Sequence, residues 1–191
     1  MAIELYYTLS SDKHPRKWHD PYVTCGGSLA TWMCFMSYME KKYLPSYKPG
    51  TIKEESYYSR FSASLGWNKS YGDMPMQEVW DLQLSSNITH AERLTMQSMM
   101  DRCFFHVIDF SCVSEAWLEV ANEMNGKGTK DAFGSLINTI RELIHKTPGI
   151  HSIAVHWNSV VSFYECNGET DENCYDFVAD NTEVESKFSN S

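Results

Sequence analysis

Two segments of this chain carry residue types that together can attack a carbonyl carbon. Cys25 opens a helix-like run, Cys25-Gly-Gly-Ser-Leu-Ala-Thr-Trp32, and His151 opens a strand-like run, His151-Ser-Ile-Ala-Val. A thiol becomes a strong nucleophile when it loses its proton, and an adjacent imidazole can accept that proton. A helix N-terminus also favours the thiolate, because its unpaired N–H groups stabilise negative charge. The two segments therefore predict a site with Cys25 as nucleophile and His151 as base.

The imidazole of such a site needs a third group to orient it. After His151 we expect the chain to turn and return as a second strand that passes Glu165. A two-residue turn at 158–159 pairs His151 with Cys166 and sends Glu165 to the opposite face. A three-residue loop or a bulge pairs His151 with Asn167 and places Glu165 diagonally on the same face. Catalysis requires the second arrangement, so the length of this turn decides whether Glu165 and Asn167 face His151.

These segments resemble the YopT/AvrPphB family of bacterial effector cysteine proteases. The segment from Cys25 to Trp32 is similar to that family's nucleophile helix, in which a Trp follows the Cys by about two turns. The segment at His151 is similar to its His-Ser/Ala-Ile/Val-Ala block, and Phe163-Tyr-Glu165-Cys-Asn167-Gly is similar to its Phe-Phe-Asp-Pro-Asn-x-Gly block. The order and the spacing also agree, with 126 residues from Cys25 to His151 and 14 more to Glu165.

The resemblance implies a papain-like α+β fold, with N-terminal helices packed on a C-terminal antiparallel sheet. It implies a catalytic triad of Cys25, His151 and Glu165, although the family has Asp at the third position and Pro where this chain has Cys166. Asn167 is the alternative orienting group, as an amide is in the papain branch. Papain-like enzymes also place a Gln shortly before the Cys to bind the oxyanion, and this chain has none there.

Other groups near Cys25 are therefore expected to bind the oxyanion. His19 lies six residues upstream, and Gly26 and Gly27 offer bare backbone beside the sulfur, with N–H groups that can stabilise an oxyanion. A structural helix avoids such glycines, because each costs up to roughly 1 kcal/mol relative to Ala.

The expected function is hydrolysis of amide bonds in a protein substrate by a thiol protease that acts as an effector or virulence toxin. A glutamine deamidase or a transglutaminase-type toxin of the same fold is the first alternative, because all three reactions begin with a thioester. A non-catalytic binding or inhibitor protein, phage- or plasmid-borne, is the second alternative. No cofactor is expected. The predicted location is the cytoplasm, or a target cell reached without a cleavable signal peptide.

Length and charge limit the possible partners. The 191 residues fit a single domain with a real core, and 42% of them are hydrophobic. The formal net charge of −9 lies entirely in the second half, where residues 101–191 carry 15 acidic and 6 basic side chains and the tail from about residue 169 is acidic. Such a surface repels phosphate, so the partner is expected to be a protein and not nucleic acid.

The composition also predicts a soluble protein without metal. No apolar stretch approaches the roughly 20 residues of a membrane span. The N-terminus has no basic region followed by an apolar one, so we expect the six cysteines to be reduced. His151, His156, Cys166 and Cys174 offer four zinc ligands, but no Cys-x-x-Cys pair is present, and we predict no metal.

Hydrophobic spacing predicts the elements that must position these groups. The pattern indicates helices at 25–43, 90–100 and 114–124, and a further helix that starts near Thr129 or Asp131 and ends before Pro148-Gly149. Strands are expected at 3–9, 103–110, 150–157 and 160–165. Residues 50–90 mix aromatic residues with Ser, Gly and Asn and are expected to form short helices and loops.

Overall fold

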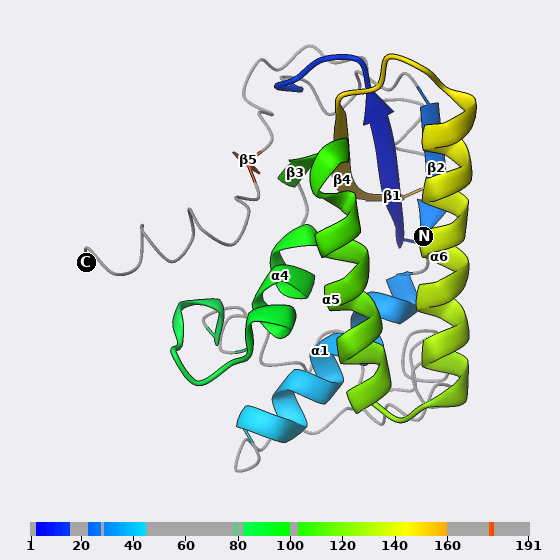
Figure 1. Cartoon of the computed structure of the whole chain (residues 1–191). Coiled ribbons are helices and arrows are strands. Elements are labelled where there is room, and N and C mark those ends of the chain that lie inside the picture. Colours follow the sequence, from blue (N-terminus) through cyan, green and yellow to red (C-terminus); the bar gives the residue numbers. More distant parts are fainter. Residues whose placement is uncertain are drawn as a thin grey trace.

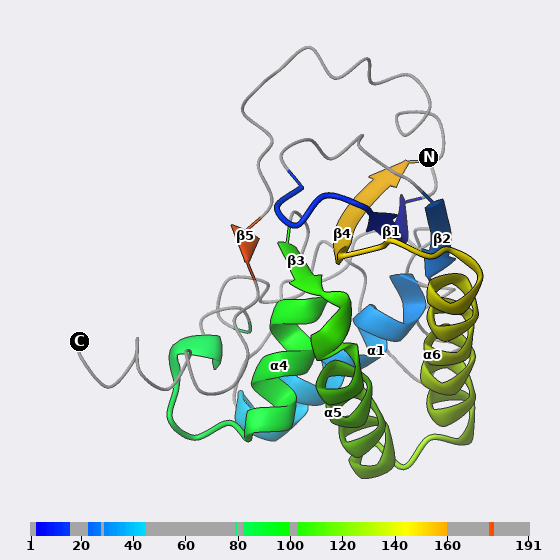
Figure 2. The same ribbon diagram turned by 45° about the horizontal axis from the view of Figure 1, so that its top comes forward.

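The computed structural model of the chain describes residues 3–15, 23–27, 29–44, 79, 82–99, 103–159 and 176–177. In this part of the chain, a five-stranded sheet has the strand order β2-β1-β4-β3-β5. Four α-helices pack on one face of this sheet (Figures 1 and 2). The chain is therefore of the α+β class, as expected.

The strands come from both ends and from the middle of the chain. They are β1 (Ile3–Ser10), β2 (Val23–Gly27), β3 (Cys103–His106), β4 (Ser152–Ser159) and β5 (Asp176–Phe177). All neighbouring strands are antiparallel except β3 and β5, which are parallel. The expectation of a C-terminal sheet is wrong, because two N-terminal strands precede all the described helices and β1 pairs with β4 along its whole length.

The described α-helices lie between β2 and β4 in the sequence, and β3 lies between the second and the third of them. They are α1 (Leu29–Tyr43), α4 (His90–Ser98), α5 (Phe110–Glu123) and α6 (Lys127–Lys146). Two short 3₁₀ helices, η2 (Leu82–Leu84) and η3 (Val107–Asp109), precede α4 and α5. Among the described helices, none combines the length and the apolar character that crossing a bilayer requires.

The main hydrophobic core fills the space between the helices and the sheet. Alternate residues of β1 point into it, namely Leu5, Tyr7 and Leu9, as the period of two in a strand requires. Trp117 of α5 lies at its centre, where its ring packs edge-on against the rings of Tyr7 at 5.5 Å and Phe133 at 6.3 Å. The described helices and strands thus share one apolar interior.

Several predicted boundaries need correction. The expected strand at 103–110 ends at His106, and α5 already begins at Phe110 because the 3₁₀ turn η3 leads directly into it. Neither Thr129 nor Asp131 caps α6, whose N-cap is Gly126. Neither the two-residue turn at 158–159 nor a longer loop begins at residue 158, since residues 158 and 159 continue β4 and pair with Glu4 and Ile3 of β1.

Candidate functional site

Cys25 lies in the middle of a strand. It belongs to β2 and pairs with Tyr7 of β1, while the following helix begins only at Leu29. The prediction that Cys25 opens this helix is wrong. Its neighbours explain the difference, because Val23 and Thr24 are β-branched and favour a strand, and the two glycines after Cys25 are poor helix formers. Cys25 therefore receives no thiolate stabilisation from a helix N-terminus.

The thiol of Cys25 faces the hydrophobic core. Only 6% of the residue is exposed, and it belongs to the cluster that Tyr7 and Trp32 also help to form. Burial raises the pKa of this thiol to about 11, and a hydrogen bond with the Tyr7 backbone offsets only part of that rise. A thiol with this pKa is protonated at neutral pH, so Cys25 is not an activated nucleophile.

His151 lies just before β4, at one end of the sheet. Its backbone N–H donates to the carbonyl of Ser10 at 2.9 Å, and its carbonyl accepts from the N–H of Val107 at 3.0 Å. These two bonds occupy both sides of its backbone, so Ser10, the last residue of β1, and Val107, which follows β3, take the place of the hairpin partner that was expected beside His151. The side chain of His151 is exposed.

The structure does not bring Cys25 and His151 together. Cys25 pairs with Tyr7, Tyr7 pairs with Val155, and Val155 lies four residues beyond His151. Two strand spacings of about 4.8 Å and four residues of about 3.3 Å then separate the backbones by roughly 10 Å across the sheet and 13 Å along it. Neither side chain is long enough to cross that gap.

The other predicted site residues divide into two groups. Gly26 and Gly27 pair with Tyr6 and Leu5 as part of β2, so their backbone belongs to the sheet and does not form a loop around a substrate. His19, Glu165 and Asn167 lie outside the described residues.

A polar cluster that the sequence pattern did not reveal surrounds the buried Glu92 and joins α1, α4 and α5, the last through the pair of Lys42 with Glu123 at 3.0 Å. Glu92 of α4 is fully buried and accepts hydrogen bonds from Lys42 at 2.8 Å and Tyr43 at 2.6 Å, both on α1. Its carboxylate also accepts from the N–H of Thr89 at 2.8 Å, which completes a capping box at the start of α4. The pattern Thr-x-x-Glu at 89–92 is the sequence signal that identifies this cap.

Electrostatics in this cluster stabilise the fold and do not favour a reaction. Burial by itself lowers the pKa of Lys42, but the hydrogen bonds to Glu92, Tyr38 and Glu123 raise it above its usual value. Burial by itself raises the pKa of Glu92, and the bonds from Lys42, Tyr43, Thr89 and Tyr38 lower it. The ammonium and the carboxylate therefore stay charged, so Lys42 is neither a nucleophile nor a base at neutral pH.

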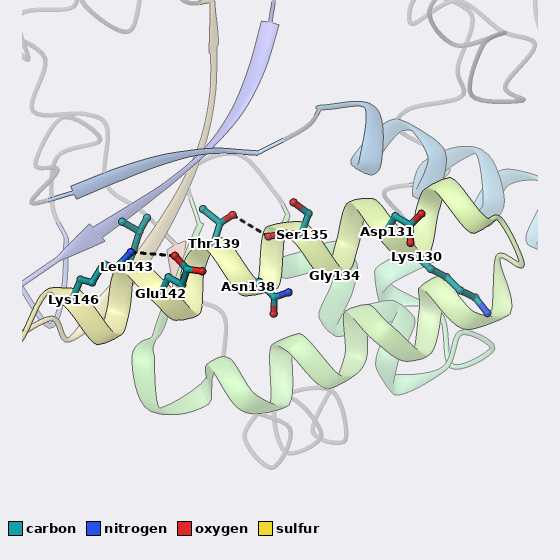
Figure 3. Close-up of a pocket in the computed structure, with 9 residues that line it drawn as sticks. All are labelled: Lys130, Asp131, Gly134, Ser135, Asn138, Thr139, Glu142, Leu143 and Lys146. Carbon is teal, nitrogen blue, oxygen red and sulfur yellow. Dashed lines mark hydrogen bonds and ion pairs between the residues drawn. The ribbon is translucent and has the colours of Figure 1, made fainter.

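A groove of about 640 Å³ follows the outer face of α6 (Figure 3). It is lined by Lys130, Asp131, Gly134, Ser135, Asn138, Thr139, Glu142, Leu143 and Lys146. Two lysines balance two carboxylates, and Lys146 already pairs with Glu142 at 3.1 Å. Ligand pockets for small molecules are usually concave and mostly apolar, whereas this groove is polar and follows a single helix. No histidine lines the groove, and one of its two carboxylates, that of Glu142, is already paired with Lys146, so its surface is better suited to contact than to acid–base chemistry.

Metal ligands are sparse in the described ranges. Within them, no group of three or more His, Cys, Asp or Glu side chains is arranged to hold a metal ion. Cys25, Cys34 and Cys112 carry free thiols, and Cys166 and Cys174 lie outside the described residues.

Comparison with protein-family models, with curated proteins and with solved structures gave no significant match for this chain.

Proposed function

We propose that this chain is a non-catalytic binding protein, with a protein as its partner. The observation that carries the proposal is the position of Cys25, whose thiol lies in the core and has a pKa of about 11. Proton transfer to His151 requires hydrogen-bond reach, and the register of the sheet separates the two residues by several times that distance.

The rest of the described surface supports binding over catalysis. Lys42 is held in its charged form by Glu92 and Glu123, and in the groove on α6 Glu142 is paired with Lys146. The excess of acidic residues in the second half of the chain disfavours nucleic acid as the partner.

The cysteine hydrolase, whether a papain-like protease, a deamidase or a transglutaminase-type toxin, stays a prediction from the sequence. It requires Cys25 to leave the core and to meet His151. No described feature favours that rearrangement, because Cys25 and the backbone of His151 are both held by the same sheet.

Alkylation of the native protein with iodoacetamide at mildly acidic pH tests this proposal. Mass spectrometry then reports the rate for each thiol, in the wild type and in His151→Ala. We expect the exposed Cys112 to react faster than Cys25, and the rate at Cys25 to be the same in both proteins. His145→Ala, an exposed histidine on α6, is the matched control.

A fast reaction at Cys25 that slows at least tenfold in His151→Ala and not in His145→Ala would overturn the proposal. That outcome would restore the thiolate–imidazole pair and with it the hydrolase.

A further inference from the structure

Two histidines meet on the face of the sheet opposite the helices. The rings of His14, Phe104 and His106 lie edge to face, and each pair of ring centres is 5.9 Å apart. We call these three residues the two-histidine cluster. Phe104 is buried and packs with Ala154 in a small apolar cluster separate from the main core.

Two elements hold the histidines in place. His106 is the last residue of β3 and pairs with Ser152 of β4, so the sheet fixes its position. His14 lies on the turn after β1, and its N–H donates to the carboxylate of Asp12 at 3.1 Å.

The turn itself is tied back to the sheet. The N–H of Asp12 donates to the hydroxyl of Ser10 at 3.0 Å, and the hydroxyl of Ser152 donates to the carbonyl of Asp12. These hydrogen bonds tie the turn to Ser152, which is the strand partner of His106, and so they hold His14 beside His106.

We propose that His14 and His106 bind a divalent transition-metal ion of the zinc or copper class. Imidazole nitrogen suits these ions, at a metal–nitrogen distance of about 2.0–2.1 Å. Two imidazoles that share an ion at that distance have ring centres on the order of 5–6 Å apart, because each centre lies about 3 Å from the metal. The 5.9 Å between the ring centres of His14 and His106 lies in this range, so ligation requires the imidazoles to turn from their edge-to-face packing but does not require the backbone to move.

The surroundings of the pair favour a cation. Phe104 packs against both rings and keeps the two imidazoles beside each other. Asp12 contributes a negative charge two residues from His14. Two protein ligands leave the remaining positions of the ion to water or to a donor from a partner, so binding is weaker than at a four-ligand structural site.

Substitution by phenylalanine separates ligation from packing. His14→Phe and His106→Phe keep an aromatic ring in the cluster but remove its nitrogens. His145→Phe, an exposed histidine on α6, is the matched control. The full chain is freed of metal with a chelator and titrated with ZnCl₂, while calorimetry and thermal unfolding are recorded.

In the wild type and in His145→Phe we expect one zinc ion per chain and a rise in Tm of about 3–6 °C at a zinc concentration ten times the Kd. Both cluster variants should lose this rise while keeping the wild-type circular dichroism. No zinc-dependent rise in the wild type, or a rise that persists in both cluster variants, would overturn the proposal.

A measurement on the wild type alone covers the case in which a variant does not fold. Diethyl pyrocarbonate modifies accessible imidazoles, and mass spectrometry locates the products. Bound zinc should slow modification of His14 at least fivefold and leave the rate at His145 unchanged. Equal rates at His14 with and without zinc would contradict the metal site.

Discussion

At the scale of single residues, the direction of a side chain decides its chemistry. Cys25 and Gly26 are neighbours in β2, yet the thiol points into the core and Gly26 is exposed, because successive residues of a strand face opposite sides. The same thiol on the exposed face would escape the burial that raises its pKa to about 11. The residue types and the spacing at Cys25 and His151 suggested a reaction. Whether the Cys25 side chain faces the core or the solvent depends on the register of β2, which those residues do not specify.

The hydroxyl of Tyr7 provides a test of burial at this scale. It is fully buried and has no hydrogen-bond partner within the described ranges, and burial together with the nearby Cys103 and Cys25 raises its pKa well above the usual value. Removing an unsatisfied buried hydroxyl relieves a desolvation cost, so Tyr7→Phe should raise the free energy of unfolding by about 1 kcal/mol. Tyr43→Phe is the control and should lower it by about 1.5 kcal/mol, because that hydroxyl donates to Glu92. Urea denaturation measures both, and destabilisation by Tyr7→Phe would show that its hydroxyl is hydrogen-bonded after all.

Glu92 predicts a pH dependence of stability. Its pKa is lowered in the folded protein, so its contribution is complete above the pKa of the unfolded chain and is lost as the pH falls through the folded value. Glu92→Gln should therefore cost about 1.5–3 kcal/mol at pH 7, and less at pH 3. Glu119→Gln on the exposed face of α5 should change stability by less than about 0.5 kcal/mol. Denaturant titrations at both pH values measure the loss of unfolding free energy. An equal loss at pH 7 and at pH 3 would show that Glu92 does not stabilise the fold through its charge.

At the scale of elements, the spacing of apolar residues identified where the helices lie more accurately than where they begin and end. The apolar spacing of α6 predicted a helix at the right place, since Phe133, Leu136, Ile137 and Ile140 are its buried residues. Its start was missed because Gly126, which has no side-chain cap, takes the N-cap position. The boundary between β2 and α1 was missed for a related reason: only one residue separates them, so the strand merged with the helical pattern that follows.

The buried and exposed faces of α6 should respond oppositely to truncation. Ile137→Ala removes a side chain that is 1% exposed and should cost about 2–5 kcal/mol of unfolding free energy. Asn138→Ala changes the next residue, which lines the open groove, and should alter stability by no more than about 0.5 kcal/mol. Thermal or urea unfolding of the two variants measures the difference, and similar costs would mean that the helix is rotated from its described position.

At the scale of the whole molecule, pairing between distant strands determines which residues can meet. β4 lies between β1 and β3, so the residue before it, His151, is flanked by Ser10 and Val107. A local hairpin was the natural expectation from two adjacent strand-like runs. The position of β4 between β1 and β3 was not predictable from the sequence, because all four described α-helices separate β4 from β1 and two of them, α5 and α6, separate it from β3, and periodicity carries no signal for such contacts.

The strand order predicts a gradient of hydrogen-exchange protection. Amides of β1 and β4 lie inside the sheet and should exchange only through global unfolding. Amides of β2, at one end of the strand order, should exchange about 100-fold faster through local opening. Hydrogen exchange followed by NMR measures both, and uniform protection across the three strands would contradict the order β2-β1-β4.

The central claim, that Cys25 is a buried and unreactive thiol, is tested most directly by its own titration. The ¹³Cβ shift of Cys25, assigned by comparison with Cys25→Ser, reports the ionisation of the thiol as pH is raised in the native protein. A thiol with a pKa of about 11 should show no titration between pH 5 and about pH 9. A titration of Cys25 with a midpoint below about 7, abolished in His151→Ala, would contradict the account and identify a thiolate–imidazole pair.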